Sequence, residues 1–313
     1  MISFILKRLV SAVALLLAIS FIAFMLLAPA AGDIARNILG EAASAEQVAM
    51  LEASLGLDQP ALVQFALWLG DAVTGDLGAS YFTRQPVWNS IVTRLPVTLS
   101  VIVLVTVLTG LVAFALGTWA AVARGAVDRV LLFLITLGDA LPAFILALLF
   151  VNVFALWLGW FPATGYVPIA ESAGGWIWSL VLPVTALTIL GVAGVAQQVR
   201  SSTIGVLHMD FIRTLRSRGL SERRIVLTSV LRNSSTNGLT ALAVQIVGIL
   251  GGSVIIEQIF ALPGLGSLVI ESTVRTDIPL ILGIVMTYVL IVLVINLLVD
   301  IAVAALNPKV RLS

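Results

Sequence analysis

Six long apolar segments constrain the fold of this chain more than any other feature of its sequence. A helix of about 20 residues is enough to cross the hydrocarbon core of a bilayer, and the short alternating segments of an outer-membrane barrel are not found. The chain is 60% hydrophobic and only 11% charged. We therefore expect an all-α integral membrane protein with six transmembrane helices. The predicted spans lie near 9–30, 97–122, 130–158, 178–199, 239–260 and 280–306.

The first apolar segment has two interpretations. Lys7 and Arg8, followed by an apolar run and by the small residues "APA" at 28–30, are also typical of a signal peptide with its cleavage site. The run from Leu9 to Ala28 is longer than the apolar region of an ordinary signal peptide. A retained first helix is the favoured interpretation.

The distribution of basic residues predicts the orientation. If the N-terminus is cytoplasmic, thirteen of the 17 basic residues fall in inner segments, as the positive-inside rule requires. Both termini are then cytoplasmic. The inner residues are Lys7, Arg8, Arg124, Arg129, Arg200, Arg213, Arg216, Arg218, Arg223, Arg224, Arg232, Lys309 and Arg311, and the outer ones are Arg36, Arg84, Arg94 and Arg275.

Two external regions are distinctive. Residues 31–95 are too long for a turn, and the stretch 44–57 has apolar residues at helical spacing behind Ser44, which predicts a capped short helix. Residues 255–279 stay apolar while carrying Glu257, Pro263 and nearby glycines. Either a helix is interrupted there near membrane depth, or it simply ends in a turn.

Several classes of chemistry are excluded by residues that the sequence lacks. It has no cysteine, and His208 is its only histidine, so thiolate and histidine-rich metal sites are not expected. The two lysines, Lys7 and Lys309, lie outside any glycine-rich loop, so the chain cannot be a P-loop ATPase. We expect no catalytic residues, no metal site and no cofactor in this chain.

Asp139 and Asp300 are the possible polar sites within the predicted spans. Such residues can mark ion coupling, or a carboxylate pair of the aspartic-protease kind, although the G-x-G-D setting is missing. Hydrogen bonding inside the helix bundle is the favoured interpretation. A transporter driven by an ion gradient and an intramembrane enzyme remain the alternatives.

Residues 200–233, here called the basic loop, hold six arginines within twenty residues. Phe211, Ile212 and Leu215 fall on one helical face, Gly219 can end that helix, and Ser221 can begin another. The pattern predicts two short helices joined by a glycine turn. Since only Phe211 accompanies the arginines as an aromatic residue, nucleic acid is not indicated. A membrane surface or a protein partner remains.

The stretch "DFIRTLRSRGLSERRIVLTSVLRN" resembles the signature E-A-A-x3-G-x9-I-x-L-P of ABC importer permeases, in the form found in the dipeptide, oligopeptide and nickel family. Arg213, Thr214 and Leu215 occupy the E-A-A position, and Gly219 is the glycine. Ser229 and Leu231 fall at the isoleucine and leucine positions of the signature. The chain departs from the family at Leu215 and Ser217, where alanine is usual, and it lacks the proline that often follows. Further similar pieces are "LGLDQP", "GDLGAS", "RLPVTLS", "LPAF", "LGWFPATG", "LVLP", "IIEQIFALPGLG", "NLLVD" and "NPKVR".

The resemblance, closest to the first, B-type permease, implies a type I importer fold. It implies a first helix at 1–30, an external region with short helices at 31–95, a five-helix core at 96–306 and a cytoplasmic tail at 307–313. The basic loop would contact an ATPase subunit. The residues implied in that contact are Phe211, Ile212, Arg213, Thr214, Leu215, Arg218, Gly219, Leu220 and Ser221.

The resemblance also implies location, partners and substrate. The chain would lie in the cytoplasmic (inner) membrane of a bacterium or archaeon, in contact with lipid. It would work with a second homologous permease, two ATPase subunits that bind ATP and Mg²⁺, and an extracytoplasmic binding protein. Di- or oligopeptides are the expected substrates, with nickel or another small solute as the alternative.

Overall fold

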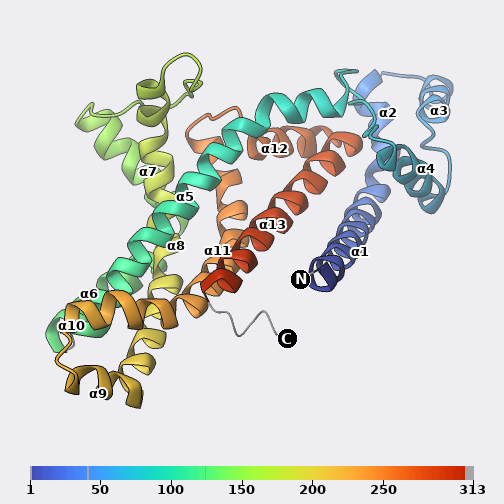
Figure 1. Ribbon diagram of the computed structural model, residues 1–313. Helices are drawn as coiled ribbons and strands as arrows, with labels where there is room; N and C mark the ends of the chain where they lie inside the picture. Colours follow the sequence, from blue (N-terminus) through green and yellow to red (C-terminus); the bar gives the residue numbers. More distant parts are fainter. Residues whose placement is uncertain (1, 41, 124, 307–313) are drawn as a thin grey trace. The chain divides into compact units, whose positions relative to one another are not determined.

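The computed structural model describes residues 2–40, 42–123 and 125–306, and its regular elements there are helices (Figure 1). The only extended pairing in these ranges is an isolated bridge between Ala79 and Pro86. The expected all-α fold is confirmed. The elements are α1 (Ile2–Leu27), α2 (Ala31–Leu39), α3 (Ala45–Ser54), α4 (Ala61–Val73), α5 (Val87–Ala123), α6 (Gly125–Ala140), α7 (Ala143–Phe150), α8 (Ala173–Leu207), α9 (Asp210–Ser217), α10 (Glu222–Ile225), α11 (Leu231–Ile259), α12 (Leu265–Arg275) and α13 (Ile278–Leu306).

Five helical stretches in the described residues are long and apolar enough to cross a membrane. They are Val10–Ala30, Val87–Ala123, Ala173–Leu207, Glu222–Ile259 and Ile278–Ala305. The predicted span at 130–158 differs, because two shorter helices, Gly125–Gly138 and Ala143–Trp157, meet there at 92°. Pro142 precedes the second helix with φ −59° and ψ 142°. A proline donates no backbone hydrogen bond and disfavours helical backbone in the residue before it, which explains the break.

The chain divides into two compact units, of which the first comprises Met1–Val97 and Pro263–Leu293. One apolar cluster surrounds Phe24, Ile34 and Leu282, with Phe65 packed against it. As predicted, Ser44 caps α3: its side chain accepts from the Gln47 N–H at 3.3 Å, and the Gln47 side chain accepts from the Ser44 N–H at 3.0 Å.

A buried carboxylate joins two distant parts of the first unit. Asp277, directly before α13, is 2% exposed and accepts hydrogen bonds from the Ser80 hydroxyl and, at 3.2 Å, from the Tyr81 N–H. Nearby, Thr276 follows directly after the end of α12 and has left-handed backbone. These contacts fix the turn at 80–86 against the start of α13.

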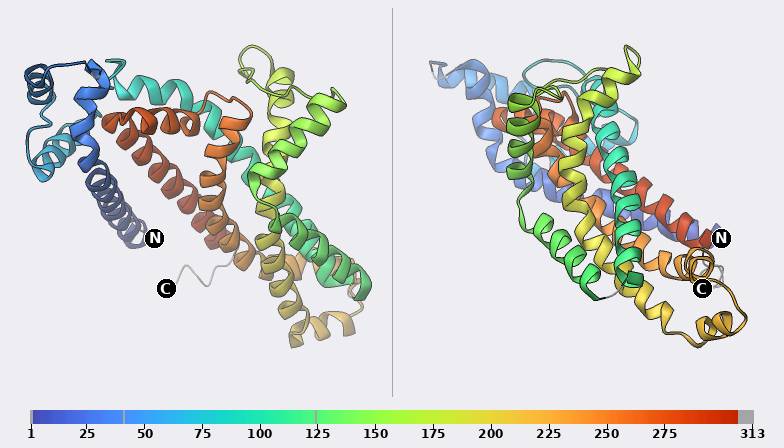
Figure 2. Two further views of the ribbon diagram at one scale, coloured as in Figure 1. Left: turned by 180° about the vertical axis from the view of Figure 1, so that it is seen from behind. Right: turned by 90° about the vertical axis from the view of Figure 1, so that its left-hand side faces the viewer.

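The second unit comprises Thr98–Leu262 and Val294–Ser313, and α8 is its central helix. In both Figures 1 and 2, α11 runs beside α8, and an apolar cluster that includes Val192, Val199 and Leu242 joins them. The contact is close at Gly238 of α11, where an added Cβ would lie 2.7 Å from the Val199 side chain of α8. Glu257, which is fully buried, accepts a hydrogen bond of 2.8 Å from Thr98.

The segment at 255–279 contains the end of one helix and the start of another. Helix α11 ends at Ile259, and the separate helix α12 begins at Leu265. Between them, Ala261 has φ 48°, a left-handed conformation that stops a helix. Pro263 and Gly264 complete the break.

Candidate functional site: the basic loop and a polar pocket

The basic loop folds as the sequence predicts, into two short helices joined at a glycine. Helix α9 covers Asp210–Ser217, and α10 begins at Glu222 after Ser221 in extended backbone. Gly219 between them has φ +79°, a left-handed conformation that glycine adopts without steric cost. Helix α10 continues through a π-helical turn, Val226–Val230, into α11.

The apolar stripe of α9 packs mainly against the loop itself. Ile212 is completely buried in a cluster with Val206, Leu207, Ile225 and Val230. Leu215 and Leu220 are half-buried against the same cluster, whereas Phe211 remains 39% exposed. The side chain of Ile212 offers no surface of its own, and its contact with a partner stays a prediction. The sequence identified the stripe but not the residues of α8, α10 and the π-helical turn that cover it.

The six arginines between Arg213 and Arg232 comprise one that is closely paired and five that are exposed. Arg216 donates from Nε to Glu222 Oε1 at 2.6 Å and from Nη2 to Oε2 at 3.2 Å, so the pair joins α9 to α10 across the glycine turn. These hydrogen bonds raise the pKa of Arg216. Arg213 lies 3.9 Å from Asp210, with both side chains largely exposed, so that contact contributes little. Arg218, Arg223, Arg224 and Arg232 are also exposed.

Smaller side chains of the loop contact backbone carbonyl groups at the helix ends. Thr214 donates to the Asp210 carbonyl at 3.3 Å, and Ser217 donates to the Thr214 carbonyl at 2.9 Å. Nδ1 of His208 lies 2.8 Å from the carbonyl oxygen of Ile204, near the end of α8. This contact places His208 at the end of α8. Among the described residues, no group of three or more histidine, aspartate or glutamate side chains could hold a metal ion.

The two aspartates of the predicted spans lie in different helices of the second unit. Asp300 is half-buried near the end of α13, and Asp139 lies near the end of α6, with its side chain outside the described part of the structure. Arg124 and the predicted tail at 307–313 also fall outside the described residues. In the same unit, Asp128 accepts from Arg200 Nε at 2.6 Å, which ties α6 to α8.

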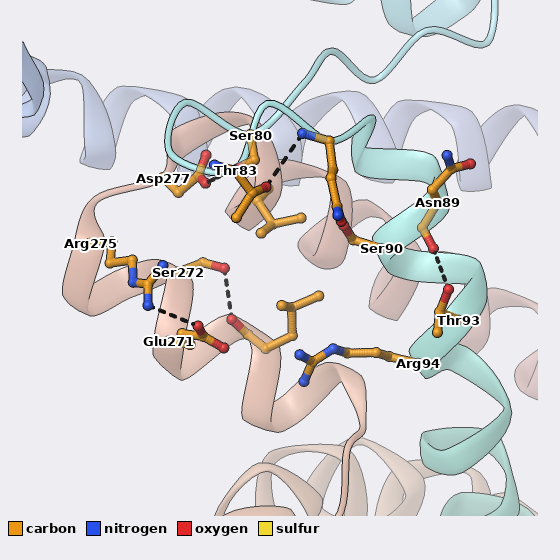
Figure 3. A pocket seen from close by; sticks show the side chains of 13 residues that line it. Ser80, Thr83, Asn89, Ser90, Thr93, Arg94, Glu271, Ser272, Arg275 and Asp277 are labelled. Atoms are coloured by element: carbon orange, nitrogen blue, oxygen red, sulfur yellow. Dashed lines mark hydrogen bonds and ion pairs between the residues drawn. The ribbon is translucent and has the colours of Figure 1, made fainter. Parts of the chain in front are cut away.

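A polar pocket in the first unit was not predicted from the sequence. It encloses about 290 Å³, and Figure 3 shows Arg94 extending from α5 toward the side of α12 that carries Glu271 and Arg275. Arg275 pairs with Glu271 at 3.2 Å, and Arg94 donates to the Ser267 hydroxyl at 3.4 Å. The lining is Ser80, Thr83, Gln85, Asn89, Ser90, Thr93, Arg94, Leu268, Glu271, Ser272, Arg275, Asp277 and Leu280.

The signal that could have identified this pocket is the charge distribution. Arg94 and Arg275 are two of the four basic residues that fall outside in the predicted topology. Hydroxyl, amide, guanidinium and carboxylate groups together can exchange hydrogen bonds with a polar solute or with a polar protein segment.

Comparison with protein families identifies the chain. Residues 113–312 match the family described as binding-protein-dependent transport system inner membrane component, and residues 1–102 match the corresponding N-terminal family. The chain belongs to this family. It is thus a multi-pass permease of the inner membrane, and the predicted resemblance to ABC importer permeases is confirmed.

Individual relatives match the permease over almost its whole length. A peptide transport system permease protein of Brucella abortus (strain 2308) is 39% identical over 99% of both chains. A peptide ABC transporter permease protein of Sinorhizobium fredii is 34% identical over 98% of this chain and 99% of the relative. The glutathione transport system permease protein GsiC of Salmonella choleraesuis is 36% identical over 99% of both.

A solved structure supports the fold. A chain of the MetNI methionine ABC transporter, in an inward-facing conformation, superposes with a TM-score of 0.57 and 16% identity. The match covers 69% of the permease and 95% of the MetNI chain. The shared part therefore has the fold of an ABC transporter chain, which agrees with the type I importer fold implied by the signature.

Proposed function

We propose that this permease forms half of the translocation pathway of an ATP-driven importer of di- and oligopeptides. The observation that carries the proposal is the packing of the basic loop. Its helix α9 packs against an apolar cluster within the loop, while the side chain of Phe211 remains exposed. The full-length relatives named for peptide and glutathione transport support the substrate class. Nickel complexes or another small solute are the alternative cargo.

In this proposal the basic loop transmits motion between an ATPase subunit and the membrane helices. Ile212 on α9 shares its cluster with Val206 and Leu207 of α8 and with Val230 before α11. A displacement of α9 by a partner would therefore move the ends of α8 and α11 with it. Such a switch needs contacts that differ between two states, because a partner that binds both states equally shifts nothing.

The working assembly that we propose pairs this chain with a second homologous permease, two ATPase subunits and an extracytoplasmic binding protein. The ATPase subunits would bind ATP and Mg²⁺. Phe211 and the exposed cations Arg213 and Arg218 would face one of them. Apolar anchors usually dominate such interfaces, so Phe211 is expected to contribute more than either arginine.

Transport by the reconstituted assembly tests the function. Proteoliposomes with all subunits should take up labelled dipeptide only with ATP inside, and Phe211→Asp should abolish uptake and release the ATPases. Arg213→Gln is the matched control, because its exposed ion pair contributes about 0 to 1 kcal/mol. ATP-driven uptake of nickel but not of peptides would make nickel, rather than peptides, the favoured substrate. Uptake driven by an ion gradient and lost in Asp139→Asn would replace the proposal with a secondary transporter.

The proposed orientation, with both termini cytoplasmic, follows from the positive-inside distribution. The chain has no cysteine, so single cysteines can be introduced without background. Ser54→Cys and Ser217→Cys place a thiol at two exposed positions. An impermeant maleimide added to intact cells should label the first and not the second, and the opposite pattern would invert the topology.

A further inference from the structure

An apolar groove of about 690 Å³ lies in the second unit, between α5 and the segment where α10 leads into α11. Three large side chains on its walls are exposed: Trp119 and Leu227 to 56%, and Val122 to 43%. Both walls belong to stretches apolar enough to span a membrane. The groove is lined by Phe114, Ala115, Thr118, Trp119, Val122, Glu222, Arg223, Val226, Leu227, Leu231 and Ser235.

Two charged residues, Glu222 and Arg223, line this groove. Glu222 is engaged by two hydrogen bonds from Arg216. Arg223, which also lines the groove, is exposed, and its side chain makes neither an ion pair nor a hydrogen bond within residues 2–40, 42–123 and 125–306. The groove therefore combines a mostly apolar lining with an unpaired guanidinium.

This combination matches one class of molecule. Exposed apolar surface on a membrane-spanning helix meets acyl chains, and basic pockets between such helices bind anionic headgroups. Arg223 can donate two parallel hydrogen bonds to phosphate oxygens. Trp119 is of the residue type enriched where the bilayer meets water, since its ring is apolar and its N–H is polar.

We propose that the groove binds an anionic phospholipid, with an acyl chain along Trp119, Val122 and Leu227 and the phosphate on Arg223. The groove adjoins the basic loop, because Val226 and Leu227 lie between Ile225 and Val230 of the loop cluster. Those four residues belong to α10 and the π-helical turn, a helix irregularity often found at functional sites. Bound lipid would thus pack against and stabilise the π-helical turn, which joins the loop to α11.

The test uses the purified complex of the permease with its partner subunits. Native mass spectrometry should detect retained phosphatidylglycerol, and added phosphatidylglycerol should raise the melting temperature more than phosphatidylcholine does. Arg223→Gln should weaken the preference for phosphatidylglycerol about fivefold, because a basic residue near the bilayer surface contributes about 1 kcal/mol. Arg232→Gln, an exposed cation outside the groove lining, should keep the preference.

A second pair of variants tests the apolar part of the groove. Ala115→Trp fills the groove and should reduce the retention of both lipids. Leu111→Trp is the matched control, because it adds the same side chain to an exposed position of α5 outside the groove lining. Equal effects of the two lipids on the wild type, or an unchanged preference in Arg223→Gln, would overturn the proposal. A complex that retains no lipid, with the groove closed by the second permease, would overturn it as well. None of these readouts depends on which solute is transported.

Discussion

At the scale of single residues, Gly219 is the position where backbone conformation decides the loop. Its φ is +79°, and no atom lies within 4 Å of the Cβ that a side chain would add, so a substitution causes backbone strain rather than a clash. Left-handed backbone costs an L-residue about 1 to 2 kcal/mol, and a β-branched residue tolerates it least. Gly219→Val should therefore reduce both transport and copurification of the ATPases. Gly219→Asn should retain most of both, because asparagine adopts this conformation more readily. Equal activity of the two variants would show that the turn is not needed.

Asp277 and Tyr81 give a second prediction at this scale. Burial, and then the negative charge of Asp277, raise the pKa of Tyr81 from 10.0 to about 12. The stability linked to this phenol is fully present below pH 10 and is lost as the pH rises toward 12. The phenolate absorbance of Tyr81 is obtained as the difference between the wild type and Tyr81→Phe, and it should increase near pH 12. In Asp277→Asn the pKa of Tyr81 should be lower, because one of the two causes of its increase is removed. A difference titration at pH 10 would contradict the burial of this ring.

At the scale of elements, the basic loop separates residues that fold it from residues available to a partner. Ile212 is fully buried and Phe211 is 39% exposed, although they are adjacent in α9. Ile212→Ala should destabilise the isolated permease by about 2 kcal/mol, since it leaves a cavity. Phe211→Ala should leave its melting temperature unchanged and weaken retention of the ATPases. Thermal unfolding in detergent and copurification, measured on both variants, distinguish the roles. Loss of stability in Phe211→Ala would assign that ring to the fold instead.

The same elements show how far sequence reasoning reaches. Apolar length and spacing predicted the helices, Ser44 predicted the cap of α3, and Gly219 predicted the turn, because each of these signals is local. The 92° break between α6 and α7 was missed, since hydropathy continues across Pro142. The inward packing of Ile212 and the polar pocket depend on contacts between residues far apart in the chain, and neither a period nor a motif encodes such contacts.

At the scale of the whole molecule, the proposed function assigns ATP hydrolysis to the partner subunits and not to the permease. Its two lysines lie outside any glycine-rich loop, so no residue can hold terminal phosphates as a P-loop lysine does. The purified chain should therefore show no vanadate-sensitive ATP hydrolysis. The complete complex should hydrolyse ATP faster when binding protein and peptide are present. In Phe211→Asp, the permease should remain in the membrane while this stimulation disappears, because the interface that carries it is broken. Hydrolysis by the chain alone, after removal of contaminating ATPases, would contradict the division of labour on which the proposed function rests.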